Sequence, residues 1–586
     1  MTSRKILLTG VFGPFGVKNE YAEATGMQME LLNNQITRGQ GVHSPRQSYW
    51  TFPLYLLAEN ISVPSTVLDF PAWKDFTREL KKGYSHVGIN FIAPNVWKAK
   101  RMAEHVRKHH PGMKIILGGY GTIIPEIERI VPCDAVCHGE GVRWLRGYFG
   151  EDADAPVRHP AILGPAYEYI YGAKGRPKGG VILPGVGCEN GCVFCMTTHQ
   201  FGKKYVPFLG SGKEFFDACL KSKFAVGSSG FTVIDENFLK NPRRARELLE
   251  EMTARNMPFV FDIFSSAEVI REVGIDFLVR LGVRMVWIGV ESKANAHRKT
   301  KGIDLKELIA ELRSKGIVVN ASAILFQEHH DAETMRDDID WVIGLGSDTV
   351  QFMNYTAFPR TALYEKFESE GLMKEMDFRH AHGQGELGFH HPNFKNPKEH
   401  FSLLKAAFRK KYLTDGPGVL NMALTAVRGY RKAVAEYINR QAEGLTWDPL
   451  TLRYVKSDKP APDEFMLLRI RKMERIARNI RLVLPAAFVF SPNKKARRKA
   501  LRAMALCRAT LGRISLKDRL TSWVMVATGL VEQVRLWAVR LAGRESIVRQ
   551  PSMRRTEFPI SRVTVRQANR GPIVLLPYRV TRPETV

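Results

Sequence analysis

The sequence lacks long apolar runs, and it has few cysteines for its length. None of its 586 residues lies in a stretch close to the about 20 apolar residues that a helix needs to cross a bilayer. The N-terminus lacks the small-residue cleavage site of a secretory signal. Seven cysteines are too few for a disulfide framework in a chain of this size. These absences predict a cytoplasmic protein, and the length predicts about three domains.

Acidic residues are scarce toward the C-terminus. The whole chain has 87 Lys and Arg against 59 Asp and Glu, a formal net charge of +28. Residues 466–586 hold 27 of the basic residues and only 6 of the acidic ones. Three-quarters of the excess positive charge therefore lies in the last fifth of the chain. This asymmetry predicts a separate role for the C-terminal region, in contact with phosphate groups or as a solvated basic face.

Short apolar strands alternate with helices over residues 1–150, which predicts a doubly wound, Rossmann-like parallel sheet. The expected strands span residues 5–9, 63–70, 86–91, 114–117 and 135–137. Gly10 follows the first of them, and Gly118, Gly119 and Tyr120 follow the fourth. Ligands bind to such sheets at the carboxyl ends of the strands, so these four residues are candidates for contact with a ligand.

Three of the seven cysteines, Cys188, Cys192 and Cys195, fall within eight positions of a glycine-rich loop. Thiolates are the ligands that iron–sulfur clusters prefer, and the Cys-x3-Cys-x2-Cys spacing lets one loop hold three corners of a cubic cluster. Without a fourth cysteine nearby, one iron stays open to a substrate or cofactor. A structural zinc site is the alternative, and His199 is near enough in sequence to complete it.

Six strand–helix units follow between residues 179 and 370. The expected strands span residues 180–184, 231–235, 259–263, 284–290, 318–325 and 349–355. Six such units predict a partial parallel (βα)6 barrel, whose active site lies at the carboxyl ends of the strands. The cysteines follow the first of these strands. Asp235 follows the second, and Glu291 and Ser292 follow the fourth.

This order of motifs resembles the radical S-adenosylmethionine enzymes that carry a cobalamin-binding domain ahead of the barrel. The cysteine spacing is that of the radical S-adenosylmethionine superfamily, with Phe194 at its usual aromatic position. Gly118-Gly119 and Gly139-Glu140-Gly141 resemble the cobalamin-binding domain. The histidine motif that binds cobalt in many cobalamin proteins is absent, because His138 has the wrong spacing. The resemblance covers roughly residues 1–370.

The resemblance implies three cofactors and assigns residues to each. Cys188, Cys192 and Cys195 would hold a [4Fe–4S] cluster. Phe194, Asp235, Glu291 and Ser292 would contact S-adenosylmethionine, with Asp235 near its methionine part and the Glu-Ser pair near its ribose. Gly10, Gly118, Gly119 and Tyr120 would lie against cobalamin. An electron donor such as flavodoxin or ferredoxin would reduce the cluster.

The resemblance also implies a reaction. Reductive cleavage of S-adenosylmethionine gives methionine and a 5′-deoxyadenosyl radical, which removes hydrogen from an unactivated carbon. With cobalamin held over the same cavity, methylation of that carbon is the expected outcome. Two alternatives stay open. One is an oxidative cyclase or rearrangement enzyme built from the same parts, and the other is a non-catalytic iron–sulfur redox sensor whose basic tail binds nucleic acid.

The remaining segments are assigned from composition and periodicity. Residues 151–178 are expected to form a linker, residues 371–547 a mainly helical basic domain, and residues 548–586 an irregular basic tail. No catalytic residue can be named from the sequence.

Two helices are expected within the basic domain. The first, residues 465–484, interleaves basic and apolar residues, and the second, residues 516–541, carries an apolar stripe with Trp523 and Trp537. A plain helical domain, a nucleic-acid surface and a helix pair lying on anionic lipid all fit this pattern. The tryptophan-bearing stripe favours peripheral contact with the cytoplasmic face of a membrane over nucleic acid. Such contact with a membrane would in turn favour a lipid or isoprenoid substrate.

Overall fold

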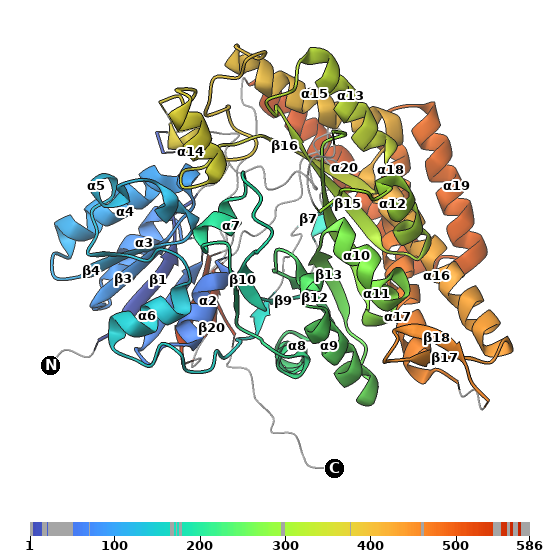
Figure 1. Ribbon diagram of the computed structural model, residues 1–586. Helices are drawn as coiled ribbons and strands as arrows, with labels where there is room; N and C mark the ends of the chain where they lie inside the picture. Colours follow the sequence, from blue (N-terminus) through green and yellow to red (C-terminus); the bar gives the residue numbers. More distant parts are fainter. Residues whose placement is uncertain are drawn as a thin grey trace.

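The computed structural model shows two sheets of parallel strands side by side, with a group of helices at the far end of the molecule (Figure 1). It describes residues 4–13, 20–21, 51–69, 71–163, 169–170, 173–174, 179–294, 299–375, 377–458, 462–542, 553–559, 563–566 and 572–575. The α/β architecture expected from the sequence is confirmed.

The first sheet contains the five parallel strands that the sequence predicts. These are β1 (Ile6–Gly10), β2 (Ser65–Asp69), β3 (His86–Asn90), β4 (Lys114–Gly118) and β5 (Ala135–Val136). They lie in the order β2-β1-β3-β4-β5. Helices α3 (Trp73–Leu80) and α4 (Val96–His109) pack on one face, and α2 (Phe52–Glu59) and α6 (Gly141–Phe149) pack on the other. The sheet is therefore doubly wound, and its strand order reverses between β1 and β3, where such sheets bind ligands.

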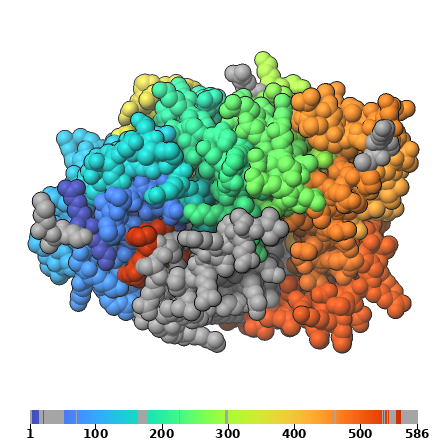
Figure 2. Space-filling view, turned by 90° about the horizontal axis from the view of Figure 1, so that it is seen from below, coloured from blue at the N-terminus to red at the C-terminus, as the bar shows by residue number. Residues whose placement is uncertain are grey.

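The C-terminal segment completes this sheet. Strand β19 (Met553–Phe558) pairs antiparallel with β2, and β20 (Val563–Arg566) and β21 (Pro572–Leu575) extend the sheet beyond it. Figure 2 shows this red segment beside the blue N-terminal residues. The expectation of an irregular tail over residues 548–586 is wrong for these strands. Pairing with β19 covers the hydrogen-bonding edge that β2 would otherwise expose.

A buried ion pair fastens β19 to the first domain. The Arg555 guanidinium lies 2.8 Å from the Glu79 carboxylate, and both side chains are largely buried. Burial raises the pKa of Glu79, but hydrogen bonds from Tyr84 and Lys82 and the charge of Arg555 outweigh it, so the pKa is lowered. Glu79 is therefore ionised in the folded protein and holds Arg555 in place.

The second sheet is the partial barrel. Its parallel strands are β9 (Gly180–Ile182), β12 (Gly230–Val233), β13 (Val260–Phe264), β14 (Val283–Glu291), β15 (Val318–Leu325) and β16 (Thr349–Asn354). They are adjacent in chain order, and all six predicted strands are present. The short strand β6 (Ile162–Leu163) adds antiparallel to β9, so the segment expected to be a linker also contributes to the sheet.

Helices cover one face of the barrel sheet and bury the largest apolar cluster among the described residues. They are α8 (Gly212–Val226), α9 (Pro242–Ala254), α10 (Ala267–Val273), α11 (Ile275–Leu281), α12 (Leu305–Ser314) and α13 (Ala332–Gly344). Several begin with side-chain caps: Ser211 and Glu214 form a capping box at α8, and Asn241 precedes Pro242 at α9.

The C-terminal domain is mainly helical, as expected. Its principal helices are α15 (Pro397–Asp415), α16 (Gly418–Ala442), α17 (Glu464–Ile480), α18 (Leu484–Val489), α19 (Lys494–Leu511) and α20 (Leu516–Leu541). The fully buried Arg469 of α17 anchors this domain, because its guanidinium donates to the backbone carbonyls of Phe259, Arg280 and Leu281 at the amino ends of the barrel strands. Within the described residues, no helix is both long and apolar enough to cross a membrane.

The Arg555–Glu79 pair gives a prediction about stability. We expect R555M to lower the free energy of unfolding by about 2–4 kcal/mol, because it leaves the buried Glu79 carboxylate with only the half-exposed Lys82 ammonium as a cation. Urea unfolding followed by circular dichroism measures the change. Since the pKa of Glu79 is lowered on folding, the pair contributes fully above the unfolded pKa, and the difference between wild type and R555M shrinks as the pH falls through the folded pKa.

The matched control is R129M, which removes an exposed arginine paired with Glu126. Exposed pairs contribute little, so R129M should unfold like the wild type. Equal unfolding of R555M and R129M would contradict a structural role for the β19 ion pair.

Candidate active site

The three cysteines lie on a loop that leaves a β-hairpin. Strand β10 (Gly185–Gly187) pairs antiparallel with β11 (Tyr205–Pro207), and Cys188 follows β10 directly. Gly187 has a φ of +89°, and a side chain there would collide with the Lys204 carbonyl. The Cys195 amide donates to the Cys192 carbonyl at 3.0 Å. Cys195 then begins the short helix α7 (Met196–Gln200) at the junction of the two sheets (Figure 1).

The thiols are partly buried and close enough to influence one another. Burial raises the pKa of Cys188 to about 11, and the charges of Cys195 and Cys192 contribute to the increase. Burial also raises the pKa of Cys192, against the opposing charge of Lys299. Such thiols ionise when a metal binds them. The loop therefore presents three candidate ligands around one space.

The three sulfurs lie too far apart to meet at one small ion. Within the described residues, the one set of three metal-ligating side chains whose ligand atoms lie within 4.8 Å of one another is His329, His330 and Asp338. A tetrahedral zinc ion would hold sulfurs at roughly 3.8 Å from each other. The three cysteine sulfurs do not all meet the 4.8 Å limit, so in this arrangement they do not form a closed site for a single ion. His199 does not close the set, and its Nε2 is buried without a hydrogen-bond partner.

Lys299 links the cysteine loop to the end of β14. Its ammonium pairs with the Glu291 carboxylate and lies 5.9 Å from the Phe194 ring. Burial lowers the pKa of Lys299, but the charges of Glu291 and Cys192 outweigh it and raise the pKa. The ammonium is therefore protonated, and it offsets negative charge at the cysteines. Phe194 packs edge-on against Tyr355, with ring centroids 6.0 Å apart.

Backbone geometry aims Glu291 toward the loop. Glu291 has a φ of +58°, and it is buried together with Ser292. A side chain at Gly289 would collide with the Glu291 carboxylate, so the glycine lets this carboxylate fold back over the strand. The charge of Glu291 contributes to the raised pKa of Cys192, so the carboxylate lies near the cysteine loop.

Ser292 is fixed by a network from α13. The Asp338 carboxylate accepts hydrogen bonds from Ser292 and from the Lys293 amide, the latter at 3.0 Å. The ring of His330 lies 3.0 Å from Asp338 and also accepts from the Gln327 amide at 2.9 Å. Both ring nitrogens of His330 are thus occupied, so this group serves to hold the Glu-Ser turn.

Asp235 has a different environment from the one expected. Its carboxylate is buried and accepts from Arg244 at 2.7 Å and from the Tyr205 hydroxyl at 2.8 Å. The Asn237 amide donates to its other oxygen at 3.1 Å. Because Tyr205 belongs to β11, this ion pair ties the end of β12 to the hairpin that carries the cysteines. Asp235 therefore has its own protein partners, which the proposed contact with S-adenosylmethionine would have to displace.

The neighbouring acid faces the cysteine loop instead. Burial raises the pKa of Glu236, and a hydrogen bond from Thr197 opposes the increase. The charge of Glu236 in turn contributes to the raised pKa values of Tyr120 and Cys188. Glu236, Lys299 and Arg244 were not identified from the sequence. Of these three, only Glu236 is signalled by the sequence, as part of the Asp-Glu pair after β12. The alternation of side chains along the strand could have indicated which of the two acids turns inward.

The carboxyl edge of the first sheet faces this loop. The Tyr120 hydroxyl lies 3.1 Å from the Thr197 hydroxyl of α7. His138, after β5, lies 3.3 Å from Arg360, after β16. Both contacts join residues that follow the carboxyl ends of parallel strands. The carboxyl edges of the two sheets therefore oppose each other.

The predicted cobalamin residues divide into two groups. Gly118 has open space where a side chain would stand, as contact with a flat ligand requires, and a side chain on Gly119 would collide with Asn90. A side chain on Gly10 would lie 2.8 Å from Thr51, so packing within the protein explains that glycine. The edge at Gly118 and Tyr120 fits a ligand placed between the sheet and the cysteines, and His138 is engaged with Arg360.

Two curated proteins match part of the chain. An uncharacterized methyltransferase of Pyrococcus horikoshii is 24% identical over 330 residues, which cover 50% of this chain and 71% of that protein. The anaerobic magnesium-protoporphyrin IX monomethyl ester cyclase of Rubrivivax gelatinosus is 24% identical over 328 residues, which cover 48% of this chain and 58% of that protein. A scan of known protein families finds none that matches.

Two solved structures of TsrM from Kitasatospora setae, a radical S-adenosylmethionine methyltransferase, are similar to this chain. One holds cobalamin and a [4Fe–4S] cluster (TM-score 0.46, 15% identity, 81% of this chain and 100% of that one). The other holds tryptophan and an S-adenosylmethionine analogue (TM-score 0.44, 16% identity, 63% and 76%). The names of these proteins agree with the family that the sequence resembles. What TsrM binds is a property of TsrM, and the function of this chain is a separate question.

The buried Asp235–Arg244 pair gives a second prediction. Both side chains are 2% exposed or less, so R244M should lower the free energy of unfolding of the metal-free protein by about 3–5 kcal/mol. The freed β11 should also loosen the cysteine loop and reduce the iron retained after reconstitution. Denaturant unfolding and iron analysis measure the two effects.

R243M is the matched control, since Arg243 precedes Arg244 on α9 and is 78% exposed. It should leave stability and iron content unchanged. If R244M were as stable as the wild type, or if both variants lost the same stability and iron, then Arg244 would not support the cysteine loop.

Proposed function

We propose that this chain is a cobalamin-dependent radical S-adenosylmethionine enzyme that methylates an unactivated carbon. The supporting observation is the opposition of the cysteine loop to the open carboxyl edge at Gly118, bridged by Tyr120 and Thr197. When bound, the cluster would supply the electron that cleaves S-adenosylmethionine, and cobalamin would supply the methyl group. The proposal assigns the three thiols to the cluster and the edge at Gly118 to the corrinoid.

The residues between these edges have defined tasks in the proposal. Lys299 stays protonated and offsets the negative charge of the thiolates. Glu291 and Ser292 would accept hydrogen bonds from the ribose hydroxyls, and Asp338, which accepts a hydrogen bond from Ser292, holds their turn in place. Phe194 and Tyr355 keep water away from one side of the loop. Each contribution comes from a residue whose position is fixed by a second one.

The inner face of the barrel supports a substrate with an apolar carbon skeleton. Buried and partly exposed residues alternate along β13 and β14. The buried set packs under the helices, so the other set lines the opposite face. On that face Phe264 and Trp287 are stacked, with ring centroids 5.2 Å apart. We propose a lipid or isoprenoid as the substrate class.

An oxidative cyclase or rearrangement enzyme is the second candidate. It uses the same cluster and S-adenosylmethionine without methyl transfer, and the 24% identity to the magnesium-protoporphyrin cyclase favours it. The products distinguish the two functions, because only methyl transfer converts S-adenosylmethionine into S-adenosylhomocysteine. The electron donor would be a small reductant protein such as flavodoxin or ferredoxin.

A product assay tests the reaction. Anaerobically reconstituted protein, given S-adenosylmethionine, a strong reductant, methylcobalamin and a deproteinised cell extract as methyl acceptor, should form 5′-deoxyadenosine and S-adenosylhomocysteine, measured by chromatography. C192A should lose at least about 100-fold of the 5′-deoxyadenosine, because the cluster loses a ligand. The matched control is C219A, at a buried cysteine of α8 remote from the loop, which should stay active. Formation of 5′-deoxyadenosine without S-adenosylhomocysteine in the presence of substrate supports the cyclase. Activity in C192A would exclude both the methylase and the cyclase.

The substrate class has its own test. With S-adenosylmethionine labelled in the methyl group and a total cell extract as acceptor, the label should enter the organic-solvent fraction. We expect F264A/W287A to reduce that transfer at least about tenfold, because the apolar wall loses both rings. Label confined to the aqueous fraction would contradict a lipid or isoprenoid substrate while leaving methyl transfer intact.

A further inference from the structure

Helix α20 carries an apolar stripe that the protein leaves uncovered. The stripe repeats at alternating spacings of four and three residues along the whole helix, which places it on one side. Its members are Leu516, Leu520, Trp523, Ala527, Leu530, Val534, Trp537 and Leu541. The large members are between 44% and 73% exposed. A stripe of this kind would normally be buried against a neighbouring element.

The exposed large apolar side chains are concentrated in this helix. Among the residues that the structure describes, eighteen large apolar side chains are exposed, and nine of them lie on α20. The other side of the helix is packed, with Ser522 and Val526 buried and Val526 in the apolar cluster shared with α18. Helix α20 is thus half-embedded in the domain. Its outer side is a contiguous apolar surface, which marks an interaction site.

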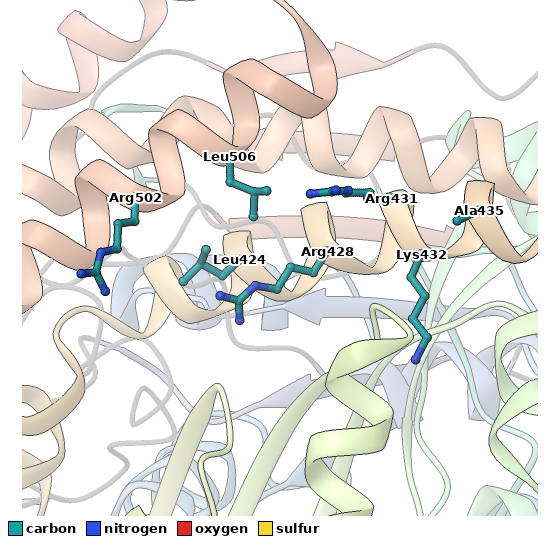
Figure 3. A pocket seen from close by; sticks show the side chains of 7 residues that line it. All are labelled: Leu424, Arg428, Arg431, Lys432, Ala435, Arg502 and Leu506. Atoms are coloured by element: carbon teal, nitrogen blue, oxygen red, sulfur yellow. The ribbon is translucent and has the colours of Figure 1, made fainter.

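The charge of the surrounding domain decides what this surface contacts. From Glu464 to Leu541 the sequence has 18 Lys and Arg against 4 Asp and Glu. A groove of about 450 Å³ lies between α16 and α19, and its lining includes Arg428, Arg431 and Arg502. Figure 3 shows these side chains on the two helices. None of these three arginines has a described carboxylate within ion-pair distance. These three side chains, with the exposed Lys517 and Arg519 of α20 itself, are therefore available to an anionic surface.

A second copy of the chain is a poorer partner. The four-three spacing would suit a coiled-coil seam, but pairing would bring two strongly basic domains together, and their repulsion opposes association. Anionic lipid combines an apolar layer for the stripe with phosphate for the surrounding cations. Tryptophan favours the boundary between the two layers, and Trp523 and Trp537 lie within the stripe.

We propose that α20 docks the protein on an anionic phospholipid surface, lying in the plane of the membrane with its stripe inserted. At 1.5 Å per residue the 26-residue helix is about 39 Å long. Because the stripe lies on one side of the helix, its residues reach the boundary layer together when the helix lies in the membrane plane. The docking concerns a surface outside the barrel, and it does not depend on the reaction that the cysteines support.

Vesicle sedimentation tests the docking. Full-length protein should sediment with vesicles of phosphatidylcholine and phosphatidylglycerol, and less with phosphatidylcholine alone. W523S/W537S should lower the partition coefficient at least about tenfold, with an unchanged melting temperature because both rings are exposed. The matched control is F224S, which removes a 75% exposed ring from α8 and should bind like the wild type.

Two outcomes would overturn the proposal. One is equal sedimentation of wild type and W523S/W537S. The other is a dimer in analytical ultracentrifugation that the double substitution dissociates, which would make the stripe an interface between copies. Raised salt should weaken binding to the anionic vesicles, as the screening of Lys and Arg requires. Since no step of this assay uses S-adenosylmethionine, its result is independent of the catalytic proposal.

Discussion

Every strand of a parallel sheet delivers its following loop to the same edge, and this molecule sets two such edges against each other. Tyr120 from the first sheet meets Thr197 behind the cysteine loop, and His138 meets Arg360. This opposition confines the cysteines, Glu236 and Lys299 to one region. If either sheet were displaced by the width of one strand, the thiols and the Gly118 edge would no longer face the same space.

Buried charges hold this arrangement, each with its own partners. Arg244 fixes Asp235 and the hairpin of the cysteine loop, and Asp338 fixes the turn after β14. Arg469 joins the helical domain to the barrel through backbone carbonyls, although burial lowers its pKa to about 9. Such groups destabilise the fold when a partner is removed. The main contribution of these groups is therefore to fix the relative positions of the elements that they join, and their net contribution to stability is smaller.

The sequence predicts the barrel and the cysteine loop well, because both depend on local signals. The six strands are apolar segments separated by capped helices, and the cysteine spacing needs no tertiary information. Asp235 shows where this reasoning ends: its partner Arg244 is nine residues away on a helix, and the local sequence does not show that the two side chains pair. Strand β19 is harder still, since its partner β2 lies more than 480 residues earlier.

The pairing of β19 with β2 also sets an order of assembly during synthesis. A ribosome adding about 5–20 residues per second needs roughly half a minute or more to pass from β2 to β19. Throughout that time the nascent first domain has an open strand edge, and Glu79 awaits its arginine. The earliest domain to emerge is thus among the last to be finished, and a chain released prematurely would carry an unsealed sheet that chaperones and proteases can recognise.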